Sequence, residues 1–352
     1  MLIPRYVKIM SYTAKTLPGT TPASKPSHHS AVIIWLYGVA MMVFTMIVVG
    51  GITRLTESGL SMVEWRPLIG MLPPLTEAEW MRVFTLYQDT PEYIHINFDM
   101  NLAQFKTIFF WEYVHRVLGR LIGLAFAVPL FIFAWRRMIP QGYGWRLIAL
   151  LCLGGFQGVI GWWMVKSGLV DNPAVSQYRL ATHLGTALMI LGLLVWTILD
   201  LQDGRAHHPG GHLMGVMGLL AITIIAGAFV AGMDAGKLYN EYPFMGDGLV
   251  PIEYGELGLK DAFENPASAQ FHHRLLAVVV VLGVFSITRR AITSGLQSRG
   301  YAVLIAVLVQ FLLGILTLLH AVPVSLGTLH QAGAAILLIT VIWASHGLSR
   351  KA

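Results

Sequence analysis

Eight long apolar runs constrain this chain more than any other feature of its sequence. They cover residues 31–50, 108–134, 146–165, 180–199, 213–232, 270–288, 301–320 and 328–346. A helix needs roughly 20 apolar residues to cross about 30 Å of hydrocarbon, and each run is about that long. Charged residues make up only 12% of the chain, about half the share that soluble proteins carry. The expected fold class is therefore an all-α polytopic membrane protein with eight transmembrane helices.

The side-chain chemistry narrows the choice of bound groups. A single cysteine, Cys152, excludes an intramolecular disulfide, a cysteine-based zinc site and a cysteine-ligated iron–sulfur cluster. Thirteen histidines make imidazole the expected ligand if a metal is bound. The net charge of +6 could suggest a nucleic-acid partner, but the cations are scattered between the apolar runs. We therefore expect the lipid bilayer, and no nucleic acid, as a partner.

Lysine and arginine are distributed unequally between the two sides of the membrane. Both tails and the loops on their side hold thirteen of them, the opposite loops hold eight, and three lie inside helices. The opposite loops also carry 15 of the 18 acidic residues. By the positive-inside rule, both termini are cytoplasmic, or in a mitochondrial matrix, and the acidic loops are external. The expected location is the inner (cytoplasmic) membrane of a bacterium, with an uncleaved first helix.

The chain repeats itself, and the repeat predicts how the helices group. Residues 115–119 read His-Arg-Val-Leu-Gly, and residues 273–277 read His-Arg-Leu-Leu-Ala. The loops after the first and fifth runs correspond at a constant offset of 177 residues. Further matched pairs are Gln157 with Gln310, Gly161 with Gly314, and His183 with His330. Each half holds an even number of helices, so both enter the membrane from the same side, as two parallel-repeat four-helix bundles.

The repeat sets the expected domain boundaries. Residues 1–30 form a cytoplasmic tail, and the N-terminal bundle spans 31–200. This bundle has a long external loop, 51–106, whose later part suits a short amphipathic surface helix. The segment 201–212 is polar and rich in Gly and Pro, as is typical of a linker. The C-terminal bundle spans 213–346, and a second cytoplasmic tail, 347–352, follows it.

Four histidines occupy repeat-matched positions in the helices that run inward from the outside: His115, His183, His273 and His330. Each lies within about three turns of the external helix end, so each half contributes two imidazoles at similar depth. Two facing imidazoles from neighbouring helices are what axial coordination of a haem iron requires. The alternative is a packing role, but intramembrane ionisable groups are costly and usually functional. The other nine histidines are expected to be incidental, with His346 facing cytoplasmic solvent.

Two arginines, Arg116 and Arg274, directly follow matched histidines. An arginine inside a membrane helix needs an anionic partner. Haem propionates near the external face would suit both by bidentate pairing, and a salt bridge to a loop carboxylate is the alternative. Arg120 occurs only in the first half and is counted with them as a cofactor-binding candidate.

The two halves differ beside their histidines, and the difference indicates where chemistry takes place. Glu112 lies one turn before His115, whereas Gln270 holds that position before His273. A carboxylate there can accept a proton, bond to an imidazole or stabilise a developing cation. We therefore predict a fixed haem in the second half and the reacting species in the first, with Glu112 as the acid/base group. The alternative is that Glu112 only pairs with an arginine of its own helix.

Several segments form a specific pattern when taken together. They are Gly50-Gly51-Ile52-Thr53-Arg54-Leu55-Thr56-Glu57-Ser58-Gly59-Leu60-Ser61-Met62, Trp65-Arg66-Pro67, Gly70, Pro73-Pro74, Phe105-Lys106, Glu112-Tyr113-Val114-His115-Arg116-Val117-Leu118-Gly119-Arg120, His183, His273-Arg274 and His330. Through them the chain resembles the haem A synthase family over about residues 31–346. The long first external loop is similar to the branch shared by proteobacteria and mitochondria. As a departure, that loop lacks the cysteine pair of some bacterial members, so it has no thiol-based role.

The resemblance implies a membrane oxidoreductase that oxidises the C8 methyl of haem O to a formyl group, giving haem A for terminal oxidases. It implies a haem b cofactor on His273 and His330 in the second half. In the first half, His115 and His183 would bind the iron of the substrate haem, with Glu112 as the catalytic carboxylate. Haem O synthase and an electron donor, either ferredoxin-like or a quinol, are the implied partners, and a homo-oligomer is left open.

Two other functions compete with this one. A bis-histidine membrane cytochrome b in quinone-linked electron transfer would need two comparable haem sites and no unique acid. The difference between Glu112 and Gln270 argues against it. A transporter built on parallel repeats would place unpaired polar residues in broken helices near the midplane. Here the charges cluster toward the external end instead.

Overall fold

The computed structural model describes residues 28–64, 72–168 and 175–351, and these residues form helices joined by loops, with no named strand. The long helices are α1 (His28–Leu55), α4 (Leu102–Trp135), α5 (Gly144–Gly168), α6 (Gln177–Asp203), α7 (Gly211–Gly232), α9 (Pro266–Thr293), α10 (Gln297–Leu319) and α11 (Val324–Lys351). All eight are long and apolar enough to cross a membrane, which confirms the eight predicted spans. Since each helix satisfies its backbone hydrogen bonds internally, the chain is built as an integral membrane protein.

The helices that carry His115 and His273 both begin at an asparagine cap. Asn101 accepts hydrogen bonds from the backbone N–H groups of Ala103 and Gln104, and the Gln104 side chain accepts from the Asn101 N–H in return. Asn265 caps α9 with Pro266 in the first turn. Such caps satisfy donors that a helix start leaves free, so they fix where these two helices begin.

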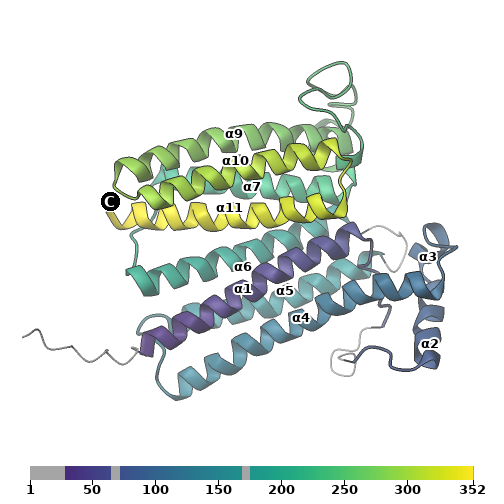
Figure 1. Ribbon diagram of the computed structural model, residues 1–352, viewed down its shortest axis with the longest axis horizontal. Coiled ribbons are helices and arrows are strands. Elements are labelled where there is room, and N and C mark those ends of the chain that lie inside the picture. The colour runs from purple at the N-terminus through teal and green to yellow at the C-terminus, as the bar shows by residue number, and fades with distance from the viewer. Residues whose placement is uncertain (1–27, 65–71, 169–174, 352) are drawn as a thin grey trace, which may run out of the picture.

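Figure 1 shows the long helices lying side by side in two groups. In one group α1 packs on α4 and α6, and α5 packs on α4 and α6; in the other, α9 packs on α7 and α10, and α10 packs on α11. Contacts of α6 with α7 and of α1 with α11 join the groups. The start of α1 and the end of α11 lie at one end of the molecule, opposite the end that carries α2 (Glu77–Gln88) and α3 (Pro91–His95).

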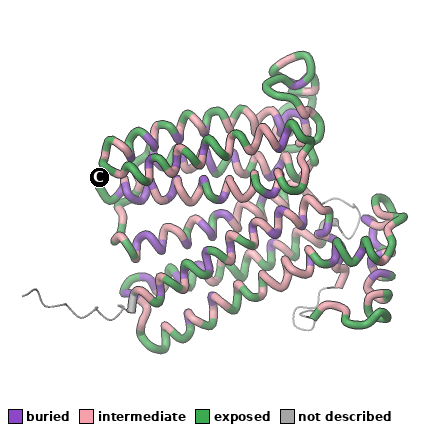
Figure 2. The backbone as a smooth tube through the Cα atoms, viewed as in Figure 1, coloured by how far each residue is buried: buried purple, intermediate pink, exposed green. Residues whose placement is uncertain are grey.

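The buried side chains form one apolar core in each group. In the first group the core contains Leu36 and Leu194, and in the second it contains Val284 and Val341. Figure 2 shows the buried residues on the inner faces of the helices. Large apolar side chains such as Phe131, which is 72% exposed, point outward. In a membrane protein these outward faces meet hydrocarbon, so their exposure carries no cost.

The predicted amphipathic surface helix is present as two short helices, α2 and α3. The α2 side chains Phe84 and Tyr87 pack against Phe105 at the start of α4, with ring centroids 5.1 and 5.2 Å from that ring. All three side chains are buried. This aromatic cluster fixes the external helices on the same helix that carries Glu112 and His115.

The helix ends differ from the boundaries predicted around the linker and the C-terminal tail. Helix α6 continues to Asp203 and α7 starts at Gly211, so only residues 204–210 connect them without helix. Helix α11 continues through residue 351, within the segment predicted as a tail. The predicted tail at 1–30 lies largely outside the described residues.

The expectation that His346 faces solvent is wrong. Its side chain is 0% exposed, and its Nε2 lies 3.0 Å from Asp200 Oδ1 of α6. Asp200 also accepts a hydrogen bond from Arg146 at 2.5 Å. His346 is therefore part of a polar contact between α6 and α11. Sequence position near a helix end could not reveal it, because the partner comes from a helix far away in the chain.

Candidate functional site

The four predicted histidines come together as two pairs. The rings of His115 on α4 and His183 on α6 have centroids 6.4 Å apart, at an interplanar angle of 52°. The rings of His273 on α9 and His330 on α11 have centroids 6.3 Å apart, at 86°. The structure thus pairs these imidazoles as the sequence predicted, one pair in each group of helices. What the pairs bind stays a prediction.

The separation within each pair suits two ligands of one metal ion. Imidazole–metal bonds are about 2.0–2.1 Å long, so two imidazoles can share one metal ion only where their rings lie close together. The rings within each pair, with centroids 6.3 and 6.4 Å apart, are close enough for this. Among the described residues, no group of three or more His, Cys, Asp or Glu side chains could hold a metal ion. A metal ion held by either pair would take its other ligands from a bound group.

A glutamine orients one histidine of each pair. The Gln157 amide donates to the carbonyl O of His183 at 2.8 Å and lies 3.1 Å from its Nδ1. The Gln310 amide does the same at His330, with distances of 3.0 and 3.1 Å. Such outer contacts fix the ring orientation of a metal ligand. The sequence identified these glutamines as a matched pair but did not predict their contact with the histidines.

The other histidine of the second pair is oriented by backbone. The Nδ1 atom of His273 lies 3.1 Å from the carbonyl O of Thr223. Because a carbonyl oxygen can only accept a hydrogen bond, Nδ1 carries the proton, and Nε2 remains available to bind a metal. Glycines make room for the rings. A Cβ added at Gly227 would lie 2.8 Å from Cε1 of His273, and one at Gly50 would lie 3.4 Å from Nε2 of His115.

Glu112 is buried and held by three donors. Glu112 is only 3% exposed. Its Oε2 accepts hydrogen bonds from the Ser61 hydroxyl and the Met62 N–H, both at 2.7 Å, and its Oε1 accepts from Arg116 at 2.5 Å. The alternative that Glu112 pairs with an arginine of its own helix is thus realised with Arg116. This ion pair is compatible with an acid/base role, because the carboxylate stays one turn from His115.

Gln270 occupies the matched position but bonds in the opposite sense. It is 2% exposed, and its amide donates to the carbonyl O of Tyr239 at 3.1 Å. Tyr239 corresponds to Met62 at the repeat offset of 177 residues. Glu112 therefore accepts a hydrogen bond from the backbone of its loop, whereas Gln270 donates one to the backbone at the matching position of the other loop. The difference read from the sequence is retained in the geometry: one pair has a carboxylate beside it and the other has a neutral amide.

Each of the two repeat-matched arginines hydrogen-bonds the loop that follows the first helix of its half. Arg116 donates to the carbonyl O atoms of Met62 (2.9 Å) and Glu64 (3.4 Å), and Arg274 donates to those of Tyr239 (2.8 Å) and Glu241 (3.0 Å). The carbonyls correspond at the same offset of 177 residues. These contacts were not predicted, and pairing of either arginine with a propionate remains a prediction.

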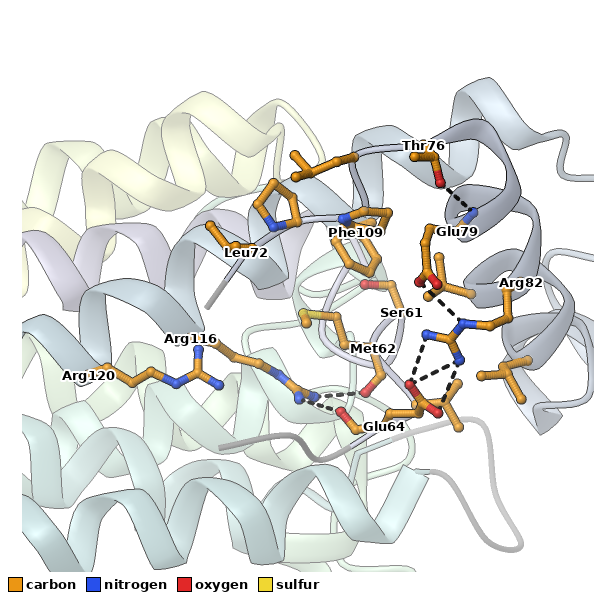
Figure 3. A pocket seen from close by; sticks show the side chains of 16 residues that line it. Ser61, Met62, Glu64, Leu72, Thr76, Glu79, Arg82, Phe109, Arg116 and Arg120 are labelled. Atoms are coloured by element: carbon orange, nitrogen blue, oxygen red, sulfur yellow. Dashed lines mark hydrogen bonds and ion pairs between the residues drawn. The ribbon is translucent and has the colours of Figure 1, made fainter. Parts of the chain in front are cut away.

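A pocket of about 360 Å³ lies between the loop after α1, α2 and α4 (Figure 3). Arg116 and Arg120 line it from α4, and Arg82 lines it from α2. Arg82 donates to Glu64 at 3.2 Å and to Glu79 at 3.3 Å. The carboxylates of Glu64 and Glu79 also line this pocket, so the cation of Arg82 is already paired there and Arg116 and Arg120 are the other two cations at its wall. Of the family segments, Trp65-Arg66-Pro67 and Gly70 lie outside the described residues.

A second buried carboxyl group, Glu92 on α3, was not singled out by the sequence. It is 4% exposed and accepts a hydrogen bond from the Tyr87 hydroxyl at 3.0 Å. Burial, together with the negative charges of Glu112 and Glu57, raises the pKa of Glu92 to about 8, although the Tyr87 hydrogen bond lowers it. No motif marks Glu92, because its burial depends on how α3 packs.

Known proteins match this chain over nearly its whole length. A family model described as cytochrome oxidase assembly protein matches residues 33–342. A protein of Rhizorhabdus wittichii named heme A synthase is 44% identical over 337 residues, which cover 94% of this chain and 97% of that protein. A protein of the same name from Caulobacter vibrioides is 46% identical, over 87% of this chain and 93% of its own length. Another, from Maricaulis maris, is 47% identical, over 91% of this chain and 98% of its own length. The chain belongs to the haem A synthase family of cytochrome oxidase assembly proteins.

Proposed function

We propose that this protein is a haem A synthase, a membrane oxidoreductase that oxidises the C8 methyl of haem O to a formyl group. Its relatives carry that name at 44–47% identity over most of their lengths. One observation of the site carries the proposal. A buried carboxylate, Glu112, stands beside one histidine pair, and a neutral amide, Gln270, stands beside the other. An enzyme that keeps one haem and alters another requires such a difference between two similar sites.

The second pair, His273 and His330, would hold haem b as the resident cofactor. When bound there, haem b supplies one-electron transfer. The Thr223 carbonyl and the Gln310 amide hold the two rings in fixed orientations, which would suit a haem that stays bound. At position 270 this site has a neutral amide where the first site has the Glu112 carboxylate.

The first pair, His115 and His183, would bind the iron of the substrate haem O. With an electron donor, the oxidation balances as two oxygenations followed by a dehydration. Each oxygenation would use one O2, two electrons and two protons, place one oxygen atom in a C–H bond of the methyl and release the other as water; the resulting gem-diol would then lose water to give the formyl group. Glu112 would serve as the acid/base group for these proton transfers at a carboxylate oxygen, which its three donors keep in place. Arg116 bonds Glu112 and also lines the pocket, so it links the carboxylate to that pocket.

Orientation and partners are part of the same proposal. We place the protein in the bacterial inner membrane with both termini cytoplasmic, because Lys and Arg are concentrated on their side. Haem O synthase would supply the substrate, and a ferredoxin-like protein or a quinol would act as the electron donor. Haem propionates would meet Arg116, Arg120 and Arg274, all of which lie toward the external end.

We also propose that the chain consists of two parallel-repeat bundles, 31–200 and 213–346. Matched contacts support this division. Gln157 and Gln310 bond their histidines in the same way, and Arg116 and Arg274 bond loop carbonyls at corresponding positions. Glu57 and its counterpart Asp234 both adopt left-handed backbone, with φ of 53° and 51°.

One feature favours the rival, a bis-histidine cytochrome b: the two ring separations are nearly equal. Analysis of extracted haems separates the two functions. A strain that makes haem O is grown with and without this protein, and its haems are identified by mass. We expect haem A only in the strain with the protein. A cytochrome b would leave haem O unaltered.

A further inference from the structure

An apolar groove lies beside the first histidine pair, where α1, α4 and α11 meet. Its lining is formed by Ile52 of α1, Trp111 of α4, and Val324, Ser325, Thr328 and Leu329 of α11. Its volume is about 610 Å³, within the roughly 300–1,000 Å³ of small-molecule sites. Leu329 is 53% exposed, so the groove opens at the outer surface of the helices, where hydrocarbon would surround it.

The groove is lined by residues that lie close along the chain to Glu112 and His115. Trp111 directly precedes Glu112 and stands four residues, about one turn, before His115 on α4. Ile52 follows closely after Gly50, where an added Cβ would lie 3.4 Å from Nε2 of His115. Two of the three helices that form the groove therefore also form the surroundings of His115.

The corresponding place beside the second pair is filled by protein side chains. The repeat puts Phe229 where Ile52 stands and Tyr178 where Ser325 stands. The Phe229 ring packs edge-on against Tyr178 and Phe263, with centroid distances of 5.3 Å in both cases. Phe229 is only 7% exposed. By the repeat alignment, three packed aromatic rings thus stand in the second half where the first half has a groove, with Phe229 buried and Tyr178 and Phe263 42% and 46% exposed.

We infer that the groove receives the isoprenoid tail of the substrate haem, an inference that rests on the proposed function. Haem O carries a hydroxyethylfarnesyl tail where haem b has a vinyl group. A tail on a haem held between helices must leave through a gap in their packing. The groove supplies that gap at the substrate site, and the aromatic plug closes it at the other, so only the haem without a tail fits there.

Thr328 places a polar group on the groove wall. It is 9% exposed, and its hydroxyl has no hydrogen-bond partner among the described residues. Other helical threonines, such as Thr53 and Thr182, donate to the carbonyl four residues earlier. A buried hydroxyl without a partner is costly. The hydroxyl at the root of the haem O tail, which haem b lacks, would provide the partner for Thr328.

Binding measurements on protein with haem b already in the second site test this inference. Haem O and further haem b are titrated separately, and binding at the first site is followed by absorbance. The double variant Ile52→Phe/Ser325→Tyr copies residues of the plug into the groove. We expect it to weaken haem O binding by at least about tenfold, which is 1.4 kcal/mol, and haem b binding by less than about twofold. Thr328→Val should weaken haem O binding alone, by about fivefold.

Ile222→Phe is the matched control, since Ile222 is 56% exposed on α7, outside the groove, and should leave both haems unaffected. A retained haem b spectrum verifies that each variant folds. Equal weakening for both haems, or unchanged haem O binding in both variants, would overturn the inference. The result is separable from the proposed function, because binding is measured without turnover. Wild-type protein that binds haem O selectively and never forms haem A would refute the function and leave the groove assignment standing.

Discussion

Glu112 and Gln270 face matching stretches of external loop and form opposite hydrogen bonds with them. The carboxylate accepts from the Met62 N–H, and the amide donates to the Tyr239 carbonyl. The difference between these residues was readable from the repeat alone. The hydrogen bond from the Ser61 hydroxyl to Glu112 could not be predicted from the repeat. Ser61 and Glu112 are 51 residues apart in the sequence, and only the folded loop brings them together.

The histidine pairs have separable predicted roles. Replacing His273 with Ala should remove the bound b-type haem and its absorption spectrum, because one axial ligand of the resident cofactor is lost. His115→Ala should keep that spectrum, since it changes only the substrate pair. His95→Ala is the control, because His95 is exposed in the external region. A b-type spectrum that survives in the His273 variant would refute the ligand assignment.

At the scale of elements, the spans were predictable because long apolar runs have few alternatives in a membrane. The ends of the helices were less predictable: α4 begins at Leu102, six residues before the predicted run, and α11 continues past its predicted end. The repeat predicted which helices group together, but not the individual close approaches between them. The short contacts of Gly227 with His273 and of Gly51 with Gln331 depend on which helices become neighbours.

The close approach of α7 to α9 predicts a local clash. In Gly227→Ala the new Cβ would meet the His273 ring at 2.8 Å, so the ring or the helix must shift, at a cost of about 1–3 kcal/mol. We expect a weakened or shifted b-type absorption spectrum. Gly38→Ala is the matched control, because nothing lies within 4 Å of its added Cβ. The same spectrum for both variants would contradict this packing.

The external helices α2 and α3 should respond to pH through Glu92. Its pKa is about 8 in the folded protein against an ordinary value of 4.5, so the folded state keeps a proton that the unfolded state loses between these values. The stability of this unit therefore falls as pH rises from about 4.5 to 8, by up to a few kcal/mol, and is greatest at the acidic end. Hydrogen exchange of residues 77–95, followed as a function of pH, measures this change in the stability of α2 and α3. Glu92→Gln should remove the dependence, and an unchanged pH profile in that variant would contradict the assignment.

At the scale of the whole molecule, polar contacts join the two groups of helices at both ends. Arg54 of α1 donates to the Ala231 carbonyl at 2.8 Å and to Asp234 at 2.9 Å, near the external end. Arg299 of α10 donates to Asp203 of α6 at 2.6 Å, near the opposite end. These contacts hold the two histidine pairs in a fixed relation. Sequence periodicity could not predict them, since they connect residues up to 180 positions apart.

The proposed orientation can be tested with single cysteines, because Cys152 is the only native one. In a Cys152→Ser background, Leu259→Cys should react with a membrane-impermeant maleimide added from outside, as Leu259 is 99% exposed in an external loop. Gln141→Cys, in the exposed loop at the other end, should react only after the membrane is opened. The reverse labelling pattern would show that the protein has the opposite orientation in the membrane.

The central claim is that Glu112 serves the oxidation and not the binding of the resident haem. Glu112→Gln makes the first site resemble the second, and Glu77→Gln changes an exposed carboxylate on α2 as the control. Haems from a strain that makes haem O are extracted and identified by mass, and the purified variants are examined for bound haem b. We expect an unchanged b-type spectrum in Glu112→Gln, with haem A reduced by about 100-fold or more. Wild-type amounts of haem A in that variant would contradict it.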